Sequence, residues 1–243
     1  MTPSAAAILA HLHTVEAERR HRAATPELHD RVVLVKAYQQ RRFSHTYADL
    51  LASTRYGAAS RFFLDELYGP SDFTRRDAQF ARVVPALVKL FPSEIVATVA
   101  TLAELHALSE MLDTHMGAAV DESVALTGAD YLRAWQRTGR SDDRAKQIAL
   151  TLDVAARLDR FTRRPLLRNS LRLMRGPARA AGLAELQQFL ETGFDTFRAM
   201  HGAQDFIAIV ETRERALASA LFSAPSGTDA NPDALADALD RLP

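Results

Sequence analysis

The stretch from Ser93 to Met116 reads SEIVATVATLAELHALSEMLDTHM, and neither proline nor glycine interrupts it. Ile95, Val99 and Leu102 recur at helical spacing along one line of this segment. A second apolar strip lies on another side of the same helix: Leu105, Leu108, Leu112 and Met116. A helix that is apolar on more than one side is normally buried by its neighbours. The segment therefore predicts a central helix near residues 93–116, surrounded by other helices.

Helix boundaries also mark the rest of the chain. Thr25-Pro26 places a capping residue before a proline at the first helical position, and residues Thr127 to Asp130 match the sequence pattern of a capping box. Residues 26–67 predict one long helix, or two nearly collinear helices with a break near Gly57. No stretch shows the sustained alternation of a β-strand. We predict an all-α bundle of about eight to nine helices in one domain over residues 1–224, followed by a flexible or weakly helical tail over residues 225–243.

The composition excludes several classes of protein. Apolar residues make up 47% of the 243 residues and charged residues 25%, as in an ordinary globular protein. The formal net charge is zero, so no overall field attracts the chain to nucleic acid. The absence of cysteine excludes disulfides and Cys-ligated metal sites. No stretch approaches the roughly 20 apolar residues of a membrane span, and no secretory signal is evident. We expect a cytoplasmic protein without a membrane span.

A polar trio continues the first apolar line of the central helix. His106, Glu110 and Asp113 lie within about 60° of one another on one helix face. A carboxylate beside an imidazole can orient it as a base, or can share a hard metal ion with it. The trio is therefore the candidate metal or active site, although the sequence names no cofactor. The alternative is that the three side chains form hydrogen bonds between helices, with arginines as partners, or lie at a solvent-exposed end.

Charge is segregated along the chain. Residues 93–143 carry nine acidic and three basic residues, whereas residues 157–179 carry eight arginines and one acid. Arginine suits bidentate binding of phosphate or carboxylate. The candidate anion-binding residues are Arg164, Arg168, Arg172 and Arg175. Nucleic acid is not the expected ligand, because almost no aromatic residues are interleaved for base stacking. The favoured alternative is that the arginines meet the acidic middle segment, within the chain or across a dimer.

The least generic stretch is FFLDELYGPSDFTRRD, residues 62–77. Gly69-Pro70 is expected to end one helix, and Thr74 and Asp77 are expected to form a capping box at the start of the next. We interpret the stretch as a structural corner between two helices. Its residues are Phe62, Phe63, Tyr68, Pro70, Phe73, Thr74 and Asp77.

This stretch also carries a resemblance to a known family. The pattern Phe-Phe-Leu-x-x-Leu-Tyr-x-Pro-x-Asp-Phe-x-x-Arg-Asp, with LAELHALSEMLD and ETRERAL further along, resembles a bacterial, all-helical family catalogued as a domain of unknown function. The resemblance covers roughly residues 30–222. It implies a helical bacterial protein, but it implies no activity and no catalytic residues.

Two hypotheses about function remain open, with a third beside them. The chain has no Gly-rich phosphate loop, no G-x-S-x-G elbow and no His-Glu-x-x-His motif. The primary hypothesis is therefore a non-catalytic binding protein, whose partner is a second copy in a homo-oligomer, another protein, or a small molecule held between helices. The competing hypothesis is a metal- or cofactor-dependent helical enzyme that uses His106, Glu110 and Asp113. The third is anion or nucleic-acid binding through the arginine face.

Overall fold

The protein is described here by a computed structural model over residues 3–66, 73–121, 125–224 and 242–243. Every regular element within these ranges is an α-helix, which confirms the all-α prediction. The bounds are α1 (Ala5–Ala23), α2 (Pro26–Thr46), α3 (Ala48–Ala52), α4 (Gly57–Glu66), α5 (Thr74–Leu90), α6 (Ser93–Ala119), α7 (Gly128–Thr138), α8 (Ser141–Thr162), α9 (Pro165–Leu173), α10 (Arg175–Ala180), α11 (Ala184–Ala199) and α12 (Gln204–Ser223).

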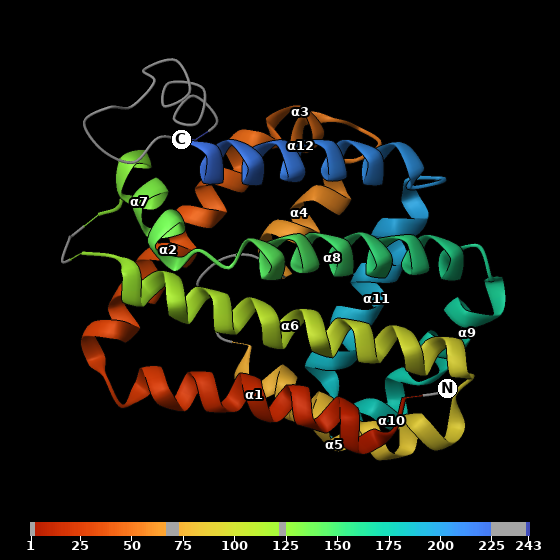
Figure 1. Cartoon of the computed structure of the whole chain (residues 1–243). Helices are drawn as coiled ribbons and strands as arrows, with labels where there is room; N and C mark the ends of the chain where they lie inside the picture. The colour runs from red at the N-terminus through yellow and green to blue at the C-terminus, as the bar shows by residue number, and fades with distance from the viewer. Residues whose placement is uncertain (1–2, 67–72, 122–124, 225–241) are drawn as a thin grey trace.

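Helix α6 lies at the centre of the molecule, as its sequence predicts. It packs against α1, α2, α7 and α8, and its most extensive contact is with α1. In Figure 1, α1, α6, α8 and α12 lie as roughly parallel rods in one layer, and α2, α4 and α11 cross behind them. The polar residues of α6 therefore lie between layers of helices.

The helices are more numerous and shorter than expected. The segment from residue 26 to 66 is divided into α2, α3 and α4, and Gly57 begins α4 where a break was predicted. The segment from Arg175 to Ala199 is likewise divided into α10 and α11, because Gly182 adopts a left-handed φ of 69° between them. Pro85, in contrast, lies inside α5 without ending it. The prediction of eight to nine helices was too low because the separate short helix α3 and the division between α10 and α11 were missed.

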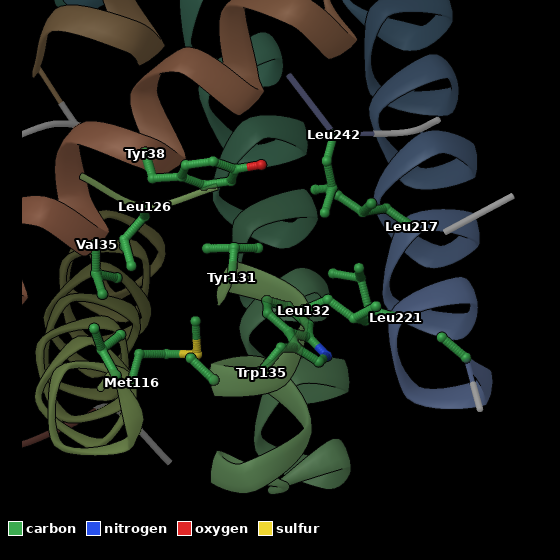
Figure 2. Close-up of a cluster of buried hydrophobic side chains, with 13 residues drawn as sticks. Val35, Tyr38, Met116, Leu126, Tyr131, Leu132, Trp135, Leu217, Leu221 and Leu242 are labelled. Carbon is green, nitrogen blue, oxygen red and sulfur yellow. The ribbon is translucent and has the colours of Figure 1, made fainter. Parts of the chain in front are cut away.

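Three clusters of buried side chains stabilise the bundle. Figure 2 shows the first, where α2, α6, α7 and α12 meet and the ring of Tyr38 stacks on Tyr131 with 4.5 Å between centroids. The second cluster joins α2, α3 and α4 to α8, α11 and α12, and the third joins α1 to α5 and α6. The first cluster includes Leu242, which is buried, whereas residues 225–241 of the expected tail lie outside the described residues. Helices from both halves of the chain thus share the same cores.

By length and composition alone, α6 could cross a membrane; it is the one helix of the described residues that meets this test. The expectation that no segment approaches a membrane span was therefore too strict. Within the structure α6 is enclosed by other helices, and it carries the paired carboxylates Glu110 and Asp113. These features are typical of a core helix in a bundle.

Candidate functional site

A cavity of about 200 Å³ lies between α2, α4, α5, α6, α8 and α11. We name it the central cavity. Its wall is mainly apolar, and the aromatic members are Phe63, Phe73, Phe80 and Phe189. His106, Glu110 and Asp113 line it from α6, and Asp77 lines it from α5. The two features that the sequence analysis singled out separately, the polar trio and the stretch of residues 62–77, therefore meet at one cavity.

Asp77 occupies this site instead of capping a helix. Helix α5 begins at Thr74, and its N-cap Phe73 makes no side-chain capping hydrogen bond. Asp77 is therefore the fourth helical residue, one position too far along the chain for a capping box. Its carboxylate binds Arg19 of α1 at 2.7 Å and His106 of α6 at 2.8 Å. The capping-box prediction for Thr74 and Asp77 was wrong, because the partners of Asp77 come from other helices.

The other corner residues serve packing. Phe62 and Phe63 are both buried at the end of α4. Phe62 stacks on Phe189, and Phe63 contacts Phe197 at its edge. Tyr68 and Pro70 lie outside the described residues.

The Asp77–His106 pair has a defined protonation pattern. Burial by itself raises the pKa of Asp77, but the hydrogen bond from His106 and the charges of His106 and Arg19 lower this pKa below its ordinary value. Asp77 is therefore an ionised acceptor, so the proton of the 2.8 Å contact belongs to Nε2 of His106. The other ring nitrogen of His106, Nδ1, forms no hydrogen bond with any residue that the structure describes.

Glu110 forms a buried ion cluster one turn further along α6. Its carboxylate accepts a 2.5 Å hydrogen bond from Arg22 of α1 and a 2.8 Å hydrogen bond from Lys36 of α2. Burial alone raises the pKa of Glu110, but the charges of Lys36 and Arg22 outweigh it and lower this pKa to about 2. Glu110 thus links three helices through charge.

Asp113 has a different environment although it faces the same lysine. Gln39 donates a 3.0 Å hydrogen bond to one carboxylate oxygen, and Lys36 lies 3.7 Å from the other. Burial raises the pKa of Asp113, Lys36 offsets this only in part, and the charge of Glu110 raises it further. The pKa values of two carboxylates on one helix face are therefore shifted in opposite directions, down for Glu110 and up for Asp113.

The metal hypothesis gains no support from this geometry. Among the described residues, no group of three or more histidine, aspartate or glutamate side chains is arranged to hold a metal ion. His106 binds Asp77, whereas Glu110 and Asp113 face Lys36. The structure agrees better with the alternative of hydrogen bonds and ion pairs between helices, with arginine among the partners.

Comparison with known proteins places the chain in a family. The profile of a domain of unknown function, DUF8198, matches residues 18–227. The chain belongs to the DUF8198 family. The matched range runs from within α1 to just past α12 and is wider than the range of residues 30–222 expected from the motif. No curated protein matches the chain, and no solved structure matches it.

The arginine face of this DUF8198 domain is largely paired within the chain. Arg164 binds Glu94 at 2.9 Å, which agrees with the expected partner segment. Arg168 binds Asp195 at 2.7 Å, and Arg175 binds Glu191; both acids lie on α11, outside the acidic segment of residues 93–143.

Arg172, the fourth candidate of this face, forms no ion pair with a described residue. Arg175 makes the largest contribution to the lowered pKa of Glu191, and Arg168 makes the largest contribution to the lowered pKa of Asp195. Arg172 has a smaller lowering effect on each pKa. These intramolecular pairs leave little of the arginine face for an external anion.

Several residues that line the central cavity of the DUF8198 domain, or that pair with its side chains, escaped the sequence analysis. Arg22 lies seven residues after Val15 and fourteen after Ile8, and Gln39 lies seven residues after Val32. Residues seven apart lie on the same side of a helix, so Arg22 and Gln39 are on buried helix faces. That spacing is a signal that could have identified them. Arg76 follows no such pattern; its guanidinium lies over the rings of Phe73 and Phe189, at 4.0 Å and 4.4 Å from their centroids.

Proposed function

We propose that the protein binds a small, mainly apolar molecule in the central cavity. The observation that carries the proposal is that a mainly apolar wall and convergent polar groups meet at one cavity between helices. Ligand sites are typically lined by hydrophobic and aromatic side chains, with a small number of polar groups that fix orientation. The polar groups here include His106, Asp77, Glu110 and Asp113, with Lys36 and Arg76 as the cations of the wall.

The size of the cavity supports a ligand of about one ring. A dry cavity of about 150 Å³ lined by leucine, isoleucine and phenylalanine is large enough to bind benzene. The central cavity, at about 200 Å³, has room for an aromatic ring with one or two small substituents. Phe73, Phe80 and Phe189 contribute apolar aromatic surface to the wall that such a molecule would contact.

The charges around the cavity favour a neutral ligand. Asp77 is paired with Arg19, Glu110 with Arg22 and Lys36, and Arg76 with Glu66 at 3.2 Å. A charged ligand would add an uncompensated charge to a site whose own charges are already paired, and burial of such a charge is unfavourable. A hydroxyl or another neutral polar group can form hydrogen bonds to these side chains without that penalty. We therefore expect a neutral aromatic alcohol or phenol to be the best class of ligand.

The test is binding of p-cresol as the probe. Saturation-transfer NMR measures binding, and native mass spectrometry of the purified protein detects any molecule it retains. Leu102 lines the cavity, so Leu102→Trp is expected to fill the space and abolish p-cresol binding. Leu166→Trp is the matched control, because Leu166 is 77% exposed on α9, away from the cavity.

Stability gives a second measurement. A ligand present at about 100 times its Kd stabilises the folded state by about 2.7 kcal/mol, and this increment should vanish in Leu102→Trp alone. Far-ultraviolet circular dichroism checks that each variant is folded. Equal binding by the native protein and by folded Leu102→Trp would place the ligand elsewhere. Failure of the native protein to bind any small neutral aromatic molecule, with nothing retained on purification, would refute the proposal.

A further inference from the structure

His106 and Asp77 form a hydrogen-bonded pair on the wall of the central cavity. The two residues come from different helices, α6 and α5, and Nε2 lies 2.8 Å from the carboxylate. Arg19 binds the same carboxylate oxygen and holds Asp77 in place from α1. The His106 side chain remains 23% exposed, so its ring is accessible.

The pair leaves one nitrogen of the imidazole able to accept a proton. An ionised carboxylate only accepts hydrogen bonds, so Nε2 of His106 carries the proton that points to Asp77. In the neutral ring the lone pair is then on Nδ1, which forms no hydrogen bond with any residue of the described ranges. A carboxylate that fixes the tautomer of a histidine and stabilises its protonated form is how aspartate supports a histidine base.

The charged groups around His106 can accommodate the proton that it gains. Asp77 and Arg76 face this region from α5, Arg19 from α1, Lys36 from α2 and Glu66 from α4, and Glu110 and Asp113 come from the helix of His106 itself. Helices α8 and α11 contribute neutral side chains to the cavity: Gln147, Thr151, Leu186, Phe189 and Leu190. The imidazolium formed by proton transfer would therefore have the Asp77 carboxylate at hydrogen-bond distance and Glu110 among its nearby opposite charges.

We propose that His106 is a general base for the molecule held in the central cavity, that Asp77 is its positioning residue, and that the substrate is a small neutral molecule with an acidic C–H or O–H bond. The inference rests on the proposed binding function and extends it to a reaction. The proton passes from the substrate to Nδ1 of His106, and the electron pair of the broken bond stays on the substrate. The imidazolium then returns the proton to the product or to water, so no oxidant or reductant is needed.

The tautomer of His106 tests the geometry without any ligand. Long-range proton–nitrogen NMR correlation distinguishes a protonated nitrogen from one with a lone pair in each histidine ring. We expect a neutral His106 with its proton on Nε2, and His106→Gln identifies the signal by removing it. A proton on Nδ1 in the neutral ring, or a ring that stays doubly protonated up to pH 8, would overturn the proposal.

The ring opening of 5-nitrobenzisoxazole tests the reactivity. A base removes the proton from C3 of this small, neutral aromatic probe, the C–H electron pair forms the third bond of a nitrile, and the N–O bond breaks to release a coloured phenolate. We expect saturable turnover by the native protein. His106→Gln should lower kcat about 100-fold or more, as expected for loss of a general base. His115→Gln is the matched control on the same helix, because His115 is exposed and outside the cavity.

Asp77→Asn tests the positioning role. Loss of the carboxylate removes the charge that stabilises protonated His106, so the pH profile of kcat should shift to lower apparent pKa and kcat should fall about 10-fold or more. A purely structural role would lower stability and leave the pH profile of the folded variant unchanged, which would refute positioning by Asp77. Saturable turnover that survives in folded His106→Gln would refute the base and leave the binding function intact. Absence of saturation in the native protein, together with no competition by p-cresol, would refute the binding function itself.

Discussion

At the scale of single residues, Glu110 joins two cations from different helices within the core. Arg22 and Glu110 have side chains only 7% and 6% exposed, so removal of the carboxylate leaves a buried guanidinium without its anionic partner. We expect Glu110→Gln to lower the free energy of unfolding by about 3–5 kcal/mol at pH 7, measured by urea denaturation. Asp121→Asn is the control. It removes the exposed ion pair with Arg137 and should change stability by less than about 1 kcal/mol.

The contribution of Glu110 to the free energy of unfolding should also depend on pH. Its pKa is about 2 in the folded protein and 4.5 when unperturbed, so the unfolded chain takes up the proton first as the pH falls. The stabilisation is therefore complete above pH 4.5 and is lost between pH 4.5 and 2. Over that range the native protein should lose about 3 kcal/mol more than Glu110→Gln. Parallel loss of stability in the two proteins would show that Glu110 does not titrate in this way.

Removal of the charge of Asp113 should affect stability differently from removal of the charge of Glu110. Burial raises its pKa, so at neutral pH its ionised form is disfavoured in the folded protein relative to the unfolded chain. Asp113→Asn removes this penalty and retains an oxygen that can accept the hydrogen bond from Gln39. We expect this variant to unfold within about 1 kcal/mol of the native protein, or to be more stable, in urea denaturation at pH 7. A loss comparable to that of Glu110→Gln would contradict the difference between the two carboxylates.

The residue scale also shows how far sequence can predict a site. Helical spacing placed His106, Glu110 and Asp113 on one face of the central helix, and all three line the cavity. Their partners, however, come from other helices: Asp77 is 29 residues from His106, and Arg22 is 88 residues from Glu110. No local pattern encodes such pairs. Only the packing of α1, α2 and α5 around α6 determines which charges meet.

At the scale of elements, Gly117 allows α2 to lie close against α6. A Cβ added to Gly117 would overlap the side chain of Val32 and lie 3.2 Å from its backbone nitrogen. Gly117→Ala should gain helix propensity of about 1 kcal/mol, but the overlap with α2 should outweigh it. We expect a net loss of about 1–3 kcal/mol in the free energy of unfolding, measured in urea.

Gly176 is the matched control for this substitution. It lies in α10, where an added Cβ would meet no atom within 4 Å. Gly176→Ala should therefore leave stability unchanged or raise it by up to about 1 kcal/mol, because only the propensity difference acts. Equal effects of the two substitutions would mean that α2 and α6 can move apart without loss of stability.

Short sequence patterns predicted a structural feature correctly only where both interacting residues are close together in the sequence. The capping box of Thr127 and Asp130 forms as the sequence pattern predicts, since its hydrogen bonds join residues three apart. Thr74 and Asp77 have the same spacing, but the carboxylate binds Arg19 and His106 instead. The breaks that shorten the helices likewise depend on tertiary packing and on single left-handed residues such as Gly182. Propensity therefore predicted that helices form, but it did not predict all of their limits.

At the scale of the whole molecule, burial is distributed unevenly. Helix α6 buries more residues than any other described helix, whereas no described side chain of α9 is buried and α10 buries only Ala178. Leu166 and Leu173 of α9 are 77% and 79% exposed. Segments with few buried apolar contacts open at lower free energy than the core. The proposed cavity thus lies beside the most protected helix and away from the most weakly packed ones.

Amide hydrogen exchange should reveal this distribution and its relation to the cavity. We expect residues 165–180 to exchange orders of magnitude faster than the centre of α6, whose exchange should approach the limit set by global unfolding. A ligand in the central cavity contacts α5, α6 and α11 and should slow exchange in these helices beyond its effect on global stability. Peptides from α9 and α10 should then change little, since they exchange by local opening that the ligand does not oppose. Slowing confined to α9 and α10 would instead place the ligand on the exposed leucines and arginines of that surface.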